Sequence, residues 1–178
     1  MRRLRAVFLV GAVLSGLGLA QTPERRVLAW SDFTGAPDPA SPFDAHTHWK
    51  VRYRYDAPLR APGGFVVDVK VGNTLEPDSW VRPAALRRPS QARLLAHEQG
   101  HYDIGLLCAL KFRKAVRART FTRAYHAEVQ ALFDAALEEA RRMDLDYDAD
   151  SKHMKDTVQQ ARWERRLAEA IAVLGGPR

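Results

Sequence analysis

The sequence contains a single cysteine, Cys108, in 178 residues. One thiol cannot form an intramolecular disulfide, so the fold has to be stabilised by its hydrophobic core. Cys108 stands among the apolar residues Ile104, Leu107 and Leu110, and a small, inert, buried thiol is the expected state of a cysteine in such surroundings. The chain is long enough to bury a core of this kind within one domain.

A large excess of one charge is also missing. The formal net charge is +7, but three arginines lie within the first five residues, and the rest of the chain carries 25 basic and 21 acidic residues. This near balance argues against binding of nucleic acid. Basic residues do gather between Lys111 and Arg123. A solvated helix face is the simpler interpretation of this cluster, and a patch for anionic lipid or an acidic partner is the alternative.

Long apolar runs are absent except at the beginning of the chain. Residues 1–20 start with MRRLR, continue through AVFLVGAVLSGLGLA, and place the small residues Gly18 and Ala20 where a signal peptidase reads them. The apolar stretch is shorter than a membrane-spanning helix requires. We expect a signal peptide that is cleaved after Ala20, one domain over residues 21–178 without stable membrane insertion, and a periplasmic or secreted location.

The remaining pattern predicts an α+β fold in which a small antiparallel sheet packs on three helices. Alternating apolar and polar residues predict the strands, and apolar residues at helical spacing predict the helices. No internal repeat or low-complexity tract interrupts the pattern. The expected elements are strands at 46–55 and 65–71, a short third strand near 80–81, and helices at 90–118, 125–143 and 153–174, the first of them with an N-cap signal at Pro89 and Ser90.

The motif HEQGH at residues 97–101 lies inside the long predicted helix. Residues four apart lie one above the other on a helix, so His97 and His101 present two imidazoles to one point, as tetrahedral zinc requires. Glu98 is placed to take a proton from zinc-bound water as it attacks a carbonyl, and to pass this proton to the leaving amine. The motif therefore predicts a zinc metallopeptidase, with a zincin-like metal helix and Glu98 as general base.

Two histidines and a water leave one zinc ligand to be assigned. Ile104 and Leu107 occupy the glycine and histidine positions of the metzincin motif, which excludes that class. Three candidates remain, namely Glu128 on the next predicted helix, Asp148, and His153 at the start of the last helix.

The sequence resembles a bacterial domain-of-unknown-function family, number 922, whose members are described as predicted secreted zinc-dependent proteases. The similarity covers nearly all of residues 21–178, and it departs from the family pattern at Ser151, where threonine is usual, and at Met154, where glycine is usual. The resemblance implies His97, His101 and His153 as zinc ligands and Glu98 as the base. The similar segments are LAWSDFTGAP at 28–37, the strand around Thr47, Ser79 with Trp80, LLAHEQGHYDI at 94–104 and YDADSKHMKDTVQQARW at 147–163.

Three other functions remain open beside hydrolysis of a peptide or protein substrate. A non-catalytic envelope-binding protein would have lost its metal or would close the site with four protein ligands, adding His153 and an acid such as Glu128 or Asp148. A hydrolase of another bond, such as an amide in cell-wall material, would leave peptides intact. A purely structural helical protein would bind no zinc.

Two further side chains near the motif have simpler interpretations. Tyr147 is expected to pack in the core, with a hydrogen bond to a developing oxyanion as the alternative. Asp103 is expected to be an exposed charge or a helix-packing contact rather than a group that orients a ligand histidine.

Overall fold

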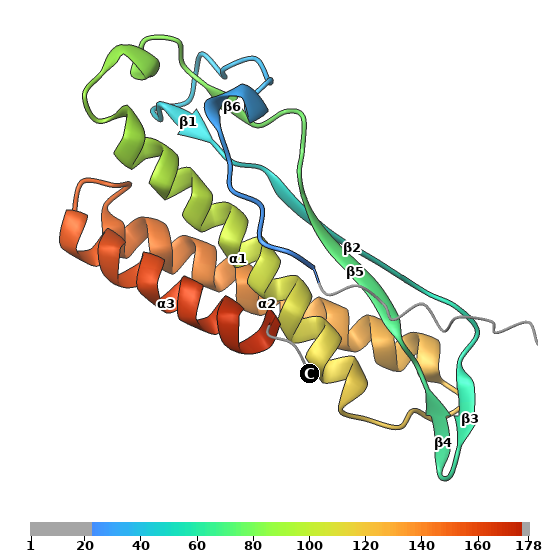
Figure 1. The fold of residues 1–178 in the computed structure, drawn as a ribbon. Coiled ribbons are helices and arrows are strands. Elements are labelled where there is room, and N and C mark those ends of the chain that lie inside the picture. The colour runs from blue at the N-terminus through green and yellow to red at the C-terminus, as the bar shows by residue number, and fades with distance from the viewer. Residues whose placement is uncertain (1–22, 176–178) are drawn as a thin grey trace, which may run out of the picture.

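The computed structural model describes residues 23–175. The fold is α+β, with three helices and three small antiparallel sheets (Figure 1). Within the described residues, no helix has the length and apolar character needed to cross a bilayer. The elements, in chain order, are η1 Trp30–Asp32, β1 Ala45–His46, β2 Trp49–Tyr55, β3 Leu59–Ala61, β4 Gly64–Val66, β5 Val69–Leu75, β6 Trp80–Val81, η2 Ala85–Arg87, α1 Gln91–Arg117, α2 Tyr125–Ser151 and α3 Thr157–Gly175.

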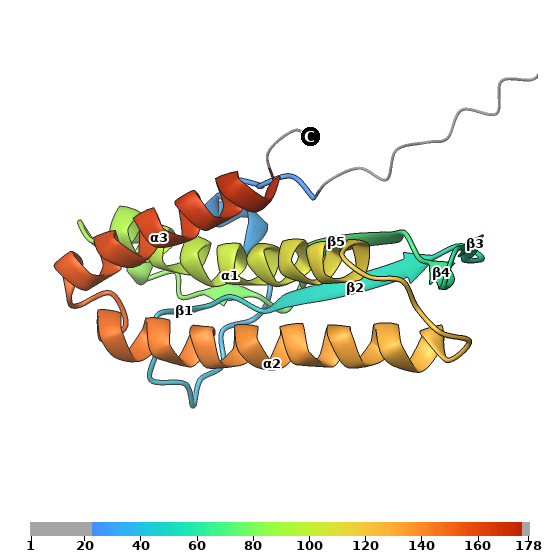
Figure 2. The same cartoon turned by 90° about the horizontal axis from the view of Figure 1, so that it is seen from below.

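Helix α1 is the centre of the molecule. It contacts α2, α3 and the β2–β5 sheet, which surround it (Figures 1 and 2). Every residue from Gly100 to Leu110 is buried, because a helix with neighbours on several sides has almost no solvent face. The predicted helix at 90–118 is confirmed to within one residue at each end, although the Ser90 side chain makes no capping hydrogen bond.

The strands form three two-stranded sheets instead of one. β2 pairs with β5 from Trp49 opposite Leu75 to Tyr55 opposite Val69, β3 and β4 form a hairpin beyond them, and β1 pairs with β6. The predicted strand at 46–55 is thus divided into β1 and β2, the strand at 65–71 is divided into β4 and β5, and β3 was not predicted. Pro58 lies in the break before β3, and it has no N–H to donate to a continuous ladder.

The two remaining helices differ from the prediction at one end each. α2 begins at Tyr125 as expected but continues to Ser151, eight residues beyond the predicted end at Met143. α3 begins at Thr157 rather than His153. The residues between them form a turn in which Lys152, His153 and Met154 all have positive φ angles, a conformation that helices exclude.

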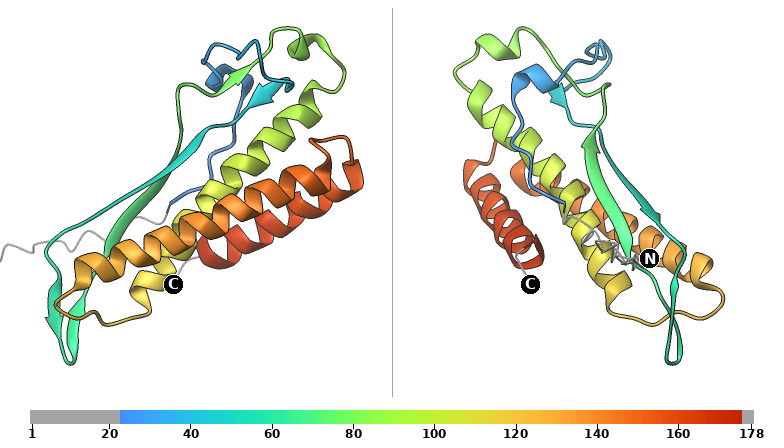
Figure 3. Two further views of the ribbon diagram at one scale, coloured as in Figure 1. Left: turned by 180° about the vertical axis from the view of Figure 1, so that it is seen from behind. Right: turned by 45° about the vertical axis from the view of Figure 1, so that its right-hand side comes forward.

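Two hydrophobic cores share α1. The larger lies between the three helices and the β2–β5 sheet and includes Phe112, Tyr147 and Leu167. The smaller joins the N-terminal segment to β1, β6 and the beginning of α1, through residues such as Phe33 and Leu94. The N-terminal segment runs along α1 (Figure 3), where the Leu28 amide N–H donates to Gln99, 2.7 Å away, and the Trp30 indole donates to Gln91, also 2.7 Å away. The proposed signal peptide at 1–20 lies outside the described residues.

Gly105 sets how closely α1 approaches the β2–β5 sheet. A Cβ atom at this position would lie 2.6 Å from Asn73 Oδ1 and 2.8 Å from Trp49 Cδ2. We expect Gly105→Ala to lower the free energy of unfolding by about 1–3 kcal/mol, because overpacking outweighs the gain in helix propensity. Urea unfolding measures the change. Gly72→Ala in β5 is the matched control, since a Cβ there meets nothing within 4 Å, and equal losses in the two variants would contradict this account of the packing.

Candidate metal centre

The two histidines of the HEQGH motif face one point, as the sequence predicted. His97 and His101 lie one turn apart on α1, and their Nε2 atoms are 3.2 Å from each other. Both residues are buried, at 4% and 9% exposure. Two imidazole nitrogens this close in a buried place need either a proton between them, as in an N–H···N hydrogen bond, or a metal ion that both bind.

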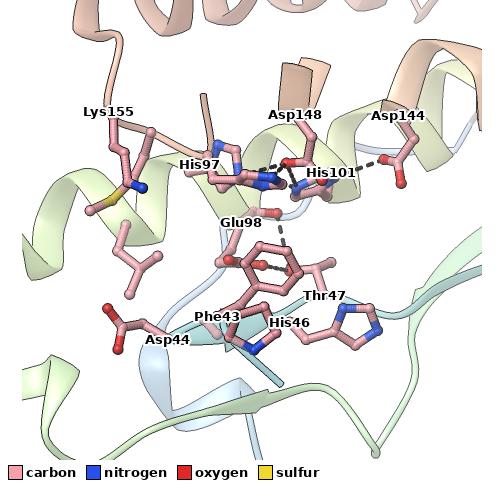
Figure 4. Close-up of a pocket in the computed structure, with 15 residues that line it drawn as sticks. Phe43, Asp44, His46, Thr47, His97, Glu98, His101, Asp144, Asp148 and Lys155 are labelled. Atoms are coloured by element: carbon pink, nitrogen blue, oxygen red, sulfur yellow. Dashed lines mark hydrogen bonds and ion pairs between the residues drawn. The ribbon is translucent and has the colours of Figure 1, made fainter. Parts of the chain in front are cut away.

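Asp148, in the last turn of α2, completes a three-membered group (Figure 4). Its Oδ1 atom is 3.1 Å from His97 Nε2 and 3.2 Å from His101 Nε2. The three atoms therefore form a nearly equilateral triangle. Tetrahedral zinc with bonds of 2.0–2.1 Å holds its nitrogen and oxygen ligands about 3.3 Å apart, close to the observed spacing. His97, His101 and Asp148 can thus hold a metal ion with little rearrangement.

A second carboxylate orients one of these histidines. Asp144 lies one turn before Asp148 on α2, and its Oδ1 is 2.8 Å from Nδ1 of His101. A proton on Nδ1 donated to Asp144 leaves the lone pair of Nε2 directed at the metal position, the arrangement common behind metal-binding histidines. The sequence analysis did not identify Asp144. The signal was present, because Asp144 and Asp148 repeat on α2 the four-residue spacing of His97 and His101 on α1.

The two aspartates also control protonation of the site. Burial alone would lower the pKa of His101, but hydrogen bonds to Asp144 and Asp148 outweigh it and raise the pKa to about 10. Burial would raise the pKa of Asp148, but hydrogen bonds from His101 and His97 hold this pKa well below its usual range. In the metal-free protein a proton therefore occupies His101 at neutral pH, and a metal ion has to displace it.

Tyr147 packs against the histidine rings and holds them in place. It is fully buried, its ring is stacked 4.8 Å from that of His97, and its hydroxyl donates to the His97 carbonyl oxygen, 3.3 Å away. Gly100 allows this contact, because a Cβ there would lie 2.5 Å from the Tyr147 hydroxyl oxygen. The packing role expected for Tyr147 is therefore confirmed.

Glu98 lies beside the metal position on the wall of the same cavity (Figure 4). Its carboxylate is buried, at 3% exposure, and its Oε2 accepts a hydrogen bond of 2.6 Å from the Thr47 hydroxyl. Thr47 lies between β1 and β2 and is itself buried. The carboxylate is thus held in one orientation next to the three possible ligands, which suits a general base.

His153 lies at the edge of the group and not in the triangle. Its Nδ1 is 3.1 Å from Asp148 Oδ1, its side chain is 44% exposed, and its ring packs 4.6 Å from that of Phe43. His153 therefore contacts the site through Asp148, and Asp148 is the third member of the group.

The other candidate for the third ligand, Glu128, does not reach the site. Glu128 lies in the first turn of α2 and accepts a hydrogen bond from the Thr122 amide, 3.1 Å away. The 20 residues that separate it from Asp148 span about 30 Å of helix. The expectation for Asp103 also needs correction in part, because this carboxylate is buried and forms an ion pair of 2.7 Å with Arg25 of the N-terminal segment.

The possible metal site opens into a cavity of about 380 Å³ beside the smaller core, whose residues Ala45 and Leu94 line it. This volume suits a short peptide segment or another small ligand. Its walls come from α1, the last turns of α2, the turn after α2 and the segment around β1. The lining residues are Pro42, Phe43, Asp44, Ala45, His46, Thr47, Leu94, His97, Glu98, His101, Asp144, Asp148, His153, Met154 and Lys155.

In metal-free protein we expect the imidazole of His101 to stay protonated at pH 8, with a midpoint near 10. Asp144→Asn removes one of the three carboxylates that raise this pKa, so the midpoint should fall. Titration of the histidine ring signals by NMR in the presence of a chelator measures both values. Asp146→Asn, an exposed aspartate on the same helix, is the control.

The raised pKa of His101 also makes the stability of the metal-free protein depend on pH. Since the folded pKa of His101 exceeds its ordinary value of 6.5, the stability it contributes to the metal-free protein is present below pH 6.5 and is lost as the pH rises towards 10. A midpoint below pH 7 in the chelated wild type would contradict this electrostatic description.

Comparison with known proteins gives a family but no activity. The sequence model of DUF922, a bacterial protein family of unknown function, matches residues 27–154. This segment includes all three residues of the possible metal site and ends directly after His153. Searches of curated proteins and of solved structures found no match. Because the match spans well over half of the chain, the protein belongs to the DUF922 family.

Proposed function

We propose that the protein is a zinc-dependent metallopeptidase that hydrolyses peptide bonds in a peptide or protein substrate. The observation that supports this is the convergence of His97, His101 and Asp148 beside the buried carboxylate of Glu98, on the wall of an open cavity. Two imidazoles and one carboxylate are a ligand set of catalytic zinc sites, which keep a fourth position open. α1 then acts as the metal helix that the HEQGH motif predicted.

In this proposal the metal and Glu98 have different roles in the hydrolysis. His97, His101 and Asp148 would hold the zinc ion, which would lower the pKa of a bound water and polarise the scissile carbonyl group. Glu98 takes the proton of the attacking water, and its hydrogen bond from Thr47 holds the carboxylate at the cavity wall where this water must lie. The same carboxylate then carries the proton to the leaving amine.

A free strand edge beside the cavity favours a peptide as the substrate. Among the strands of residues 23–175, β1 has a partner on one side only, β6. The backbone N–H of Arg82, the residue after β6, donates a hydrogen bond of 2.8 Å to the carbonyl oxygen of Asp44, the residue before β1. Hydrogen-bonded and non-bonded pairs alternate in an antiparallel ladder, so the N–H and C=O of the next residue, Ala45, point away from β6. An extended peptide can add to this edge, and Ala45 lines the cavity.

The proposed cellular location depends on a different part of the chain. Residues 1–20 have the pattern of a cleaved signal peptide, and on this pattern alone we propose a periplasmic or secreted location.

One observation favours a second function, a binding protein with a structural metal. The His153 ring already lies 3.1 Å from Asp148 Oδ1. A small rotation of this half-exposed side chain would add a fourth protein ligand and leave no position for water. The two proposals therefore differ in the role of one histidine.

Metal content tests the proposed ligands. We expect the chain from Gln21 to bind about one zinc per molecule, and Asp148→Asn to lose most of it, because an amide is a poor replacement for an anionic ligand. Glu98→Gln should keep its zinc but lose about a hundredfold to ten-thousandfold in kcat on an internally quenched peptide library. Elemental analysis and fluorescence measure the two effects, and Asp146→Asn is again the matched control. Activity that survives Glu98→Gln would contradict the role of this residue.

His153→Ala separates the two proposals. A catalytic site with three protein ligands keeps about one zinc in this variant, whereas a closed structural site loses it. If the wild type binds zinc and leaves all peptides intact while it cuts peptidoglycan fragments, the protein is a hydrolase of another bond. Absence of zinc from wild type, even after incubation with zinc, would contradict every metal-dependent proposal.

A further inference from the structure

The β3–β4 hairpin lies at the other end of the molecule from β1 (Figures 1 and 3), and both residues of β1 line the cavity. Its orientation is fixed, because Phe65 and Phe121 exchange two backbone hydrogen bonds of 2.8 Å, and the Phe65 ring packs 5.7 Å from that of Tyr125. We define the hairpin end as residues 54–70 and 117–126. Sixteen helical residues separate His101 from Arg117, which is about 24 Å along α1.

The outer face of this hairpin is apolar. Leu59 is paired with Val66, so their side chains share one face, while Arg60 and Phe65 share the other. Phe65 faces the body of the protein, and the Leu59–Val66 face is therefore directed outwards. Leu59 is 69% exposed and Val66 is 42% exposed. A single exposed apolar residue is ordinary, but a paired set on a protruding hairpin is a candidate contact surface.

The hairpin end also carries the positive charge of the described chain. It contains six arginine or lysine residues and two aspartates, whereas the rest of residues 23–175 contains eighteen basic and nineteen acidic residues. Asp56 forms an ion pair with Lys70, and Asp68 forms one with Arg117, both at 3.0 Å. Four cations then have no acidic partner within the described residues: Arg54, Arg60, Arg119 and Arg123.

We propose that the hairpin end binds the surface of an anionic lipid bilayer. The exposed Leu59 and Val66 enter the boundary between headgroups and acyl chains, and three of the unpaired arginines, Arg54, Arg119 and Arg123, contact lipid phosphates. A soluble acidic polymer would use the arginines but would gain nothing from the outward apolar pair. Bound in this way, the protein holds the cavity at the end that points away from the membrane, where a substrate in solution can enter it.

Vesicle binding by the chain from Gln21 tests this inference, since the fold described here lies within residues 23–175. At low salt we expect the protein to sediment with phosphatidylglycerol vesicles and not with phosphatidylcholine vesicles. Arg119→Glu with Arg123→Glu should weaken binding about tenfold or more. The matched control is Arg162→Glu with Arg165→Glu on α3, an identical change of charge on two exposed residues, which should bind as the wild type does.

The apolar contribution has its own variant pair. Leu59→Ser should weaken vesicle binding about threefold to tenfold, and Val173→Ser, at an 81% exposed position on α3, should leave it unchanged. Circular dichroism confirms that each variant is folded. The inference is overturned if wild type fails to bind anionic vesicles, if the two arginine pairs lose equally, or if Leu59→Ser binds as tightly as wild type, since the attraction would then be to charge alone.

Discussion

The contact between α1 and the end of α2 is the constraint on which the candidate site depends. Three ligand atoms from two helices can meet only if the helices approach closely where His97 and Asp148 face each other. Gly100 on α1 and Tyr147 on α2 provide that approach, because the tyrosine ring lies where a side chain at residue 100 would be. Tyr147 also stacks on His97 and contacts the His101 ring edge-on. One aromatic ring thus joins the hydrophobic core to the metal position.

The last turns of α2 are built against the usual preferences of a helix. Four aspartates, at positions 144, 146, 148 and 150, lie near the C-terminus, where the helix dipole disfavours negative charge. The following turn places Lys152, His153 and Met154 at positive φ without any glycine. Such costs persist where function requires them. Here two of the aspartates face His97 and His101, Asp150 accepts a hydrogen bond of 3.0 Å from the Trp163 indole, and the turn holds His153 at the cavity.

The sequence predicted correctly those parts of the molecule in which the local pattern of apolar and polar residues matches the packing of the folded protein. α1 could be placed within one residue, and its histidine pair could be identified, because helix geometry alone brings residues four apart together. The end of α2 could not be placed, since DLDYDAD has the composition of a loop. The buried stripe nevertheless continues through Ala140, Tyr147 and Ser151. His153 was therefore preferred as the third ligand, Asp148 was only one of the alternatives, and Asp144 was missed. The division of the strands depends on Pro58 and on contacts distant in sequence, such as Phe65 with Phe121, which no local pattern contains.

We propose that His97, His101 and Asp148 together hold one metal ion. Crystals grown with zinc and measured at the zinc absorption edge would locate the ion directly by anomalous scattering. The account predicts a single strong peak about 2 Å from Nε2 of both histidines and from an Asp148 oxygen, with Asp144 still bonded to Nδ1 of His101. A peak elsewhere, or a zinc ion bound by His153 in place of Asp148, would contradict it.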